Sequence, residues 1–258
     1  MAIEQGDGAP RHRIYHRTIA DAPLLGVGGH RQPGHQRHAA AGRHHVAQGL
    51  ETGALEALIL AYTGGKMHLS GISTAEGVEL IRAAKKEGLD LTADVHLMNL
   101  CFTEEKMLDF DTRFKVLPVL RTAADQDALW AGLIDGTLDA VVSDHRPGDP
   151  EEKELEFDLA HFGAPQLETV FSALLNQKPE ALQQILSALN SGPRKVLELP
   201  LQTIEIGAIA ELTLFDPSVS YAPNMRPEQW RFSPFQEADL QGQIIGIIRG
   251  NQASIAQS

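Results

Sequence analysis

The chain has 258 residues, of which 43% are hydrophobic, and it carries a formal net charge of −12. This length allows one large α/β domain or a domain with a small appendage, and the hydrophobic fraction supports a packed core. The acidic balance argues against a nucleic-acid-binding surface, which needs clustered basic residues. No apolar run approaches the roughly 18 residues of a membrane span.

The chain contains a single cysteine, Cys101. One cysteine rules out an internal disulfide framework and is typical of a reducing compartment. The first residues lack the continuous apolar segment of a signal peptide. We therefore expect a cytoplasmic protein with no membrane or nucleic-acid partner.

Residues 1–50 differ in composition from the rest of the chain. They contain six arginines, no lysine, three acidic residues and seven of the eleven histidines. They show no sustained helical or strand period, so we expect no packed core here. Clustered histidines allow a metal-binding tract, but the abrupt change in composition favours a disordered arm or a stretch translated in a wrong frame.

From residue 51 onward the pattern becomes regular. A helix is predicted over 55–62, a strand over 66–70, and a helix that Ser73 or Thr74 caps and Gly88 ends. Residues 91–97 form the next predicted strand. This strand–helix–strand unit is the repeating element of a parallel sheet.

A second such strand is predicted at Ala140–Val142, after a short helix over 125–133. It is followed by Asp144, His145 and Pro147, and a proline cannot continue strand pairing. In a (β/α)₈ barrel, polar residues at the C-terminal tip of a strand face the active site. Asp144 is therefore a candidate catalytic acid or base; the alternative is that it caps the following loop.

Two helices are predicted next, over 166–175 and 179–189. The end of the chain then changes character, because alternating strands at 206–217 and 242–250 follow without an intervening helix. This pattern favours a small β-module beside the α/β domain. We expect three units: an atypical segment at 1–50, the α/β part at 51–198 and the β-module at 199–258.

Three motifs in this order resemble a dihydroorotase-type cyclic amidohydrolase over residues 54–250, the C-terminal half of that family. The loop Lys115–Thr122 resembles the family's Lys-Val-Asn-Pro-Pro-Leu-Arg-Thr. The stretch Asp135–Pro147 resembles its Asp-Gly-Thr-Ile-Asp…Thr-Asp-His-Ala-Pro-His motif, with Glu151–Lys153 following. Gly207–Pro217 resembles the signature of the family's β-module. The tripeptide His145-Arg146-Pro147 resembles the corresponding residues of a divergent bacterial branch of the family.

The resemblance implies part of a metal-dependent (β/α)₈ barrel that closes N-carbamoyl-aspartate to dihydroorotate, or opens it, in pyrimidine biosynthesis. It implies zinc as cofactor and Asp144 as the aspartate that touches the metal and shuttles the proton. His145 and Arg121 are implied substrate-binding residues. His68 and His96 are candidate metal ligands by recruitment.

This sequence departs from the family at several ligand positions. Gly71 stands where relatives have a metal-binding histidine, Leu117 where an asparagine binds substrate, and Gly148 where a second histidine helps to hold it. The His-x-His pair of the first barrel strand and the mid-barrel ligand have no counterpart. With Asp144 as the one remaining family ligand, a zinc site with three protein ligands cannot be built in the usual way.

Two functions therefore stay open. The first is dihydroorotase-like hydrolysis of a cyclic amide, with Asp144 as general acid and base on a small-molecule substrate. The second is a non-catalytic relative without metal that partners aspartate transcarbamoylase or forms a homo-oligomer. The three predicted parallel strands would leave open sheet edges, which also points to a degenerate or truncated barrel.

Overall fold

The structure is a computed structural model that describes residues 60–201, 203–223 and 228–255. It is an α/β protein with a parallel sheet and a separate antiparallel sheet. The atypical segment predicted at 1–50 and most of the helix predicted at 55–62 lie outside the described residues. Within the described part, no helix is long and apolar enough to cross a lipid bilayer.

The parallel sheet has three strands in the order β1-β2-β3: β1 (Lys66–Leu69), β2 (Asp90–His96) and β3 (Ala140–Val142). His68 pairs with Thr92, and His96 pairs with Val142. The sequence predicted all three strands, and each is confirmed to within about one residue. Because the strands are parallel, their carboxyl ends meet at one edge of the sheet.

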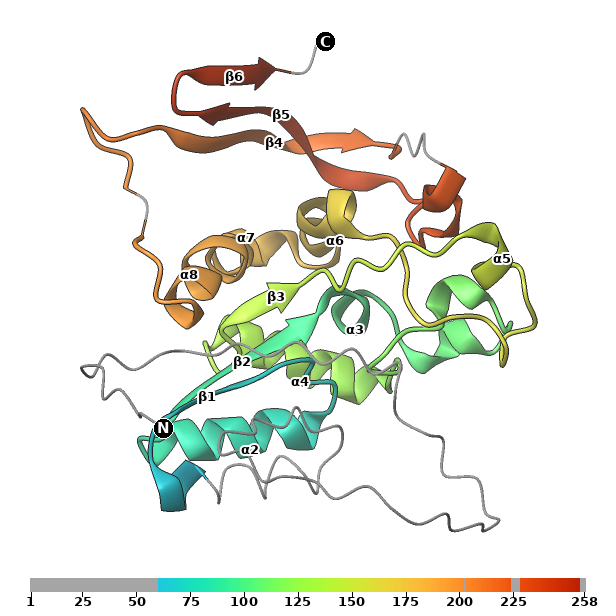
Figure 1. Ribbon diagram of the computed structural model, residues 1–258, viewed down its shortest axis with the longest axis horizontal. Coiled ribbons are helices and arrows are strands. Elements are labelled where there is room, and N and C mark those ends of the chain that lie inside the picture. Colours follow the sequence, from blue (N-terminus) through green and yellow to red (C-terminus); the bar gives the residue numbers. More distant parts are fainter. Residues whose placement is uncertain (1–59, 202, 224–227, 256–258) are drawn as a thin grey trace, which may run out of the picture.

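Two long helices, α2 (Ala75–Lys86) and α4 (Ala123–Ile134), lie together along one face of this sheet (Figure 1). The side chain of Thr74 accepts a hydrogen bond from the N–H of Gly77 and caps α2, as predicted. Thr122 and Asp125 form a reciprocal capping box that starts α4. Short polar side chains thus fix where both helices begin.

The other helices are shorter, and α6, α7 and α8 lie between the two sheets (Figure 1). The region predicted as one helix over 179–189 is broken into 3₁₀, α and π segments that run on to Val196. The shorter helices of the chain are α3 (Leu97–Cys101), α5 (Pro150–Lys153), α6 (Val170–Gln177), α7 (Leu182–Leu186), a π-helical turn (Ser187–Ser191) and α8 (Gly192–Val196).

The antiparallel sheet is formed by β4 (Glu211–Tyr221), β5 (Leu240–Arg249) and β6 (Gln252–Ile255). The sequence predicted β4 and β5 but not β6. The prediction that Pro217 ends the first strand was wrong. The pairing instead shifts register between Asp216 and Ser220, so a bulge absorbs the proline and the strand continues.

One hydrophobic core joins the two parts of the chain. Residues of the short segment before β5 are buried against the parallel-sheet domain, since the ring of Phe235 lies 5.2 Å from that of Phe102. Phe102 in turn contacts Phe114 edge to face at 5.0 Å. Strand β5 packs against α6 at Gly242, where an added β-carbon would lie 2.7 Å from the side chain of Leu175.

Candidate functional site

The carboxyl ends of the parallel strands gather four candidate side chains. His68 lies near the end of β1, Asp94 and His96 lie among the last three residues of β2, and Asp144 follows β3 by two residues. All four are mostly buried. Asp144 adopts a left-handed backbone conformation with φ +45°, which is uncommon outside glycine. The sequence predicted Asp144 at a strand tip, and the structure places it two residues after the end of β3.

Asp94 organises the β1 side of this edge. Its Oδ2 accepts a hydrogen bond from His68 Nε2 at 2.9 Å. Its Oδ1 accepts from Ser70 Oγ at 3.0 Å and from the N–H of Gly71 at 2.7 Å. Asp94 itself is only 2% exposed, so these three donors satisfy a carboxylate that water barely reaches.

The electrostatic state of Asp94 follows from these contacts. Burial by itself raises the pKa of the carboxyl group, because it disfavours the charged form. The hydrogen bond and positive field of His68, the nearby His96 and the N–H of Gly71 act in the opposite direction and prevail. The pKa of Asp94 is therefore lowered, and the residue is ionised in the folded protein.

Both ring nitrogens of His68 are engaged. Nε2 bonds to Asp94, and Nδ1 lies 2.8 Å from Thr92 Oγ1. A metal ligand must offer a free nitrogen lone pair. His68 would have to give up one of these two hydrogen bonds to bind a metal.

Asp144 is held by two nitrogen-bearing side chains. Arg146 Nε lies 2.9 Å from Oδ1, and His96 Nδ1 lies 3.7 Å from Oδ2. The Asp144 side chain is 11% exposed and that of Arg146 is 32% exposed. The carboxylate therefore has a guanidinium on one oxygen and an imidazole near the other.

His96 fills the space beside Gly71. A β-carbon on Gly71 would come within 3.1 Å of His96 Nε2 and 3.2 Å of Pro118 Cγ. Gly71 is also left-handed, with φ +76°. The position where relatives are expected to carry a metal-binding histidine is thus occupied by backbone alone, with the imidazole of His96 packed against it.

His145 points its Nδ1 at the backbone of the next segment. This nitrogen accepts hydrogen bonds from the N–H groups of Gln166 at 3.0 Å and Leu167 at 3.1 Å. The ring also lies 5.2 Å from that of Trp230. Because Nδ1 is an acceptor, the ring proton resides on Nε2. The role predicted for His145 in substrate binding stays a prediction.

Arg121 is half-buried in the loop that precedes α4. Its Nε is buried, and within the described residues it has no hydrogen-bond partner. In the same part of the chain, no hydrogen bond or ion pair links it to Asp144. The structure thus brings Asp144 together with His96, while the substrate-binding role of Arg121 also stays a prediction.

Sequence reasoning did not identify Arg146, Ser70 and Thr92 as parts of this site. Arg146 carried a signal, since it stands where the family motif has alanine, two residues after Asp144. Ser70 and Thr92 carried none, because short hydroxyl side chains at strand ends are common. Only the paired strands show that they bond to Asp94 and His68.

These residues do not fit a zinc site. A catalytic zinc ion takes three protein ligands and keeps a fourth position open. Within the described part of the chain, no group of three histidine, cysteine, aspartate or glutamate side chains is placed to hold a metal ion. His68 is fully hydrogen-bonded, and the nearest cation to Asp144 is the guanidinium of Arg146.

The fold resembles that of solved hydantoinases and of a dihydroorotase-like domain. The L-hydantoinase (dihydropyrimidinase) from Arthrobacter aurescens superposes with a TM-score of 0.73 at 24% identity, covering 79% of this chain and 48% of that one. An inactive dihydroorotase-like domain of the Chaetomium thermophilum CAD-like multifunctional protein gives a TM-score of 0.60 at 20% identity, covering 81% and 56%. No protein-family model matches the chain.

By sequence, the chain is similar to dihydroorotases. The chain is 36% identical to a dihydroorotase of Syntrophotalea carbinolica over 200 residues, covering 76% of this chain and 47% of the relative. It is 37% identical to a dihydroorotase of Thermus aquaticus over 235 residues, covering 89% and 53%. The resemblance to dihydroorotase-type cyclic amidohydrolases is confirmed, and the chain spans about half the length of these relatives.

Proposed function

We propose that this chain is a non-catalytic dihydroorotase-like scaffold. The observation that carries the proposal is the pair Gly71 and His96: the metal-binding position has no side chain, and the imidazole of His96 fills the space beside it. His68 adds support, since both of its nitrogens are committed to hydrogen bonds. Without three ligands, a zinc-bound nucleophile cannot be generated.

The proposed scaffold is part of a (β/α)₈ barrel. The three parallel strands account for three of its eight, and β1 and β3 are edge strands within the described residues. Edge strands present unpaired backbone groups that readily accept another strand. We propose the division at residues 1–50, 51–198 and 199–258 as the domain organisation of the chain.

The exposed segment between α8 and β4 supports a partner-binding role. Six of its apolar side chains are between 44% and 109% exposed, and Ile204, Ile206 and Ile209 are the most exposed among them. A run of exposed apolar side chains is typical of a protein–protein contact. The six are Leu197, Leu199, Leu201, Ile204, Ile206 and Ile209.

The proposed partner is aspartate transcarbamoylase, in the cytoplasm and in pyrimidine biosynthesis; a homo-oligomer is the alternative assembly. The Chaetomium thermophilum domain is inactive and belongs to a multifunctional protein, which accords with a dihydroorotase-like fold retained for assembly. The single buried thiol of Cys101 accords with a reducing compartment.

The second candidate function is hydrolysis of a cyclic amide of the dihydroorotate class. The observation in its favour is Asp144, which stays at a strand tip with 11% of its side chain exposed. In this role the carboxylate would take a proton from the nucleophile and pass it to the leaving nitrogen. It would first have to part from Arg146, which now occupies Oδ1.

One experiment separates the two functions. The full chain is purified, supplied with zinc, and assayed for opening of dihydroorotate beside the Asp144→Asn variant. The scaffold proposal expects no turnover that depends on Asp144, and expects co-elution with aspartate transcarbamoylase in size-exclusion chromatography. Turnover that Asp144→Asn abolishes would refute it and establish the enzyme.

A further inference from the structure

We propose that Arg146 supplies the positive charge that faces Asp144, in the place that a metal ion takes in the family this chain resembles. The inference rests on the proposed function, in which the site holds no metal. It adds that the guanidinium of Arg146, a side chain of the protein itself, replaces the positive charge of the metal ion. The site is then a permanent ion pair at the tip of β3.

The contact is an ion pair. Arg146 Nε lies 2.9 Å from Asp144 Oδ1. The second oxygen lies 3.7 Å from His96 Nδ1. An aspartate that is 11% exposed needs a compensating charge, because taking a carboxylate out of water is costly. Within the described residues, Arg146 is the permanently charged side chain that meets this need.

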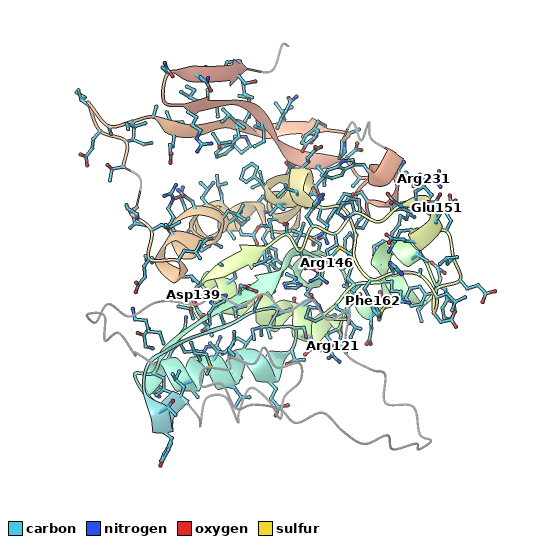
Figure 2. The ribbon with its side chains drawn as sticks, viewed as in Figure 1. Arg121, Asp139, Arg146, Glu151, Phe162 and Arg231 are labelled. Atoms are coloured by element: carbon cyan, nitrogen blue, oxygen red, sulfur yellow. The ribbon has the colours of Figure 1, made fainter. Side chains whose placement is uncertain are left out.

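Arg146 is fixed in place by its backbone. Its N–H donates to the carbonyl of Ala164 at 3.0 Å, and His145 forms a parallel bridge with the same residue. Gly163 lies so close that a β-carbon there would come within 2.5 Å of Arg146 Cβ. The loop after β3 is therefore clamped, and the guanidinium is directed at Asp144. Figure 2 shows Arg146 at the end of β3 opposite to Asp139.

The sequence shows a matching exchange. The family motif has alanine where this chain has Arg146, and a metal-binding histidine where it has Gly71. A cation is gained two residues from Asp144, while a ligand is lost two residues after the end of β1. Keeping both a metal and Arg146 would place two cations on one carboxylate, with Coulomb repulsion between them.

The test compares the Arg146→Ala variant with a matched control. Asp111 and Arg113 also form an aspartate–arginine pair two residues apart, with the arginine 31% exposed, but they belong to the 3₁₀ helix Thr112–Phe114 and its N-cap and do not follow a strand. Wild type, Arg146→Ala, Arg113→Ala, Asp144→Asn and the Asp144→Asn/Arg146→Ala double variant are prepared as full chains. Their melting temperatures are measured with excess zinc chloride and with a chelator.

We expect Arg146→Ala to lower the Tm by about 2–4 °C, and to lower it no further when Asp144 is already asparagine. Zinc should raise the Tm of Arg146→Ala alone, because an external cation then takes the vacated place. Wild type and Arg113→Ala should not respond. If Arg146→Ala does not fold, Arg146→Lys carries the test: it keeps the charge and should be stable and insensitive to zinc.

The proposal is overturned if wild type takes up an equivalent of zinc that Asp144→Asn abolishes. It is also overturned if Arg146→Ala is as stable as wild type, or responds to zinc no differently from Arg113→Ala. The failure of the proposed function is a separate result. If metal-free wild type opens dihydroorotate, the scaffold proposal is wrong, but the proposed role of the Asp144–Arg146 pair stands. If wild type is inactive but binds zinc, the proposed role of this pair is wrong, but the non-catalytic function stands.

Discussion

The imidazole of His96 packs against the α-carbon of Gly71, so closely that a β-carbon there would lie 3.1 Å from Nε2. Gly71 also has φ +76°, a conformation that other residues adopt only with strain. Two independent effects therefore keep a side chain out of this position. One is local and the other comes from the neighbouring strand.

We predict that Gly71→Ala destabilises the protein by about 2 kcal/mol, from backbone strain and crowding together. Gly88→Ala is the matched control, because Gly88 has φ +83° and nothing within 4 Å of an added β-carbon. Chemical denaturation of both variants separates crowding from strain. The prediction fails if the two lose equal stability, or if His96→Ala does not reduce the loss caused by Gly71→Ala.

The second prediction concerns the tautomer of His145. Since its Nδ1 accepts from the N–H groups of Gln166 and Leu167, the ring should carry its proton on Nε2 at neutral pH. Nitrogen-15 NMR of histidine-labelled protein should show an unprotonated Nδ1 for this residue. Assignment comes from the His145→Gln spectrum. A protonated Nδ1 would contradict the two hydrogen bonds that this nitrogen accepts.

The third prediction is a pH dependence of stability at Lys153. This side chain is 2% exposed, and its Nζ donates to the carbonyls of Thr112, His161 and Gly163. Burial, followed by the positive charge of Lys115, lowers its pKa to about 8 from the usual 10.5. Below pH 8 the amine is protonated in both the folded and unfolded states.

Between pH 8 and 10.5 the unfolded chain therefore binds more protons at Lys153, so this residue adds stability as the pH rises. This pKa shift corresponds to a change of about 3 kcal/mol at most in the free energy of unfolding. The free energy of unfolding, measured from pH 7 to 10, should rise for wild type relative to Lys153→Met. A difference between the two that stays flat over this range would show that the pKa is not lowered.

The fourth prediction tests the contact between α8 and β3. A β-carbon on Gly192 would lie 1.8 Å from the carbonyl oxygen of Asp139, and backbone cannot yield as a flexible side chain can. We expect Gly192→Ala to cost about 3 kcal/mol, although alanine favours helices. Gly77→Ala in α2, where the nearest atoms belong to side chains, should cost far less. Thermal denaturation checks both, and equal losses would contradict the prediction.

Local patterns predicted the elements that a single segment can specify. The β3 strand is a short apolar run, and Thr74 caps α2 as its hydroxyl and position indicate. The order of the elements predicted a parallel sheet, with Asp144 at a strand tip. The predicted end of β4 was wrong, because a bulge accommodates Pro217 within the strand and residue propensities do not reveal such a bulge.

By itself, the sequence determined an α/β chain with a β-module and a catalytic-type aspartate at a strand tip, because these follow from residues close together in the chain. Only the tertiary structure decided what that aspartate touches. Asp144, itself in a left-handed conformation, lies against Arg146, and the ring of His96 packs against Gly71, which follows β1. Such contacts depend on loop conformation and strand pairing, which bring together groups that no local pattern connects.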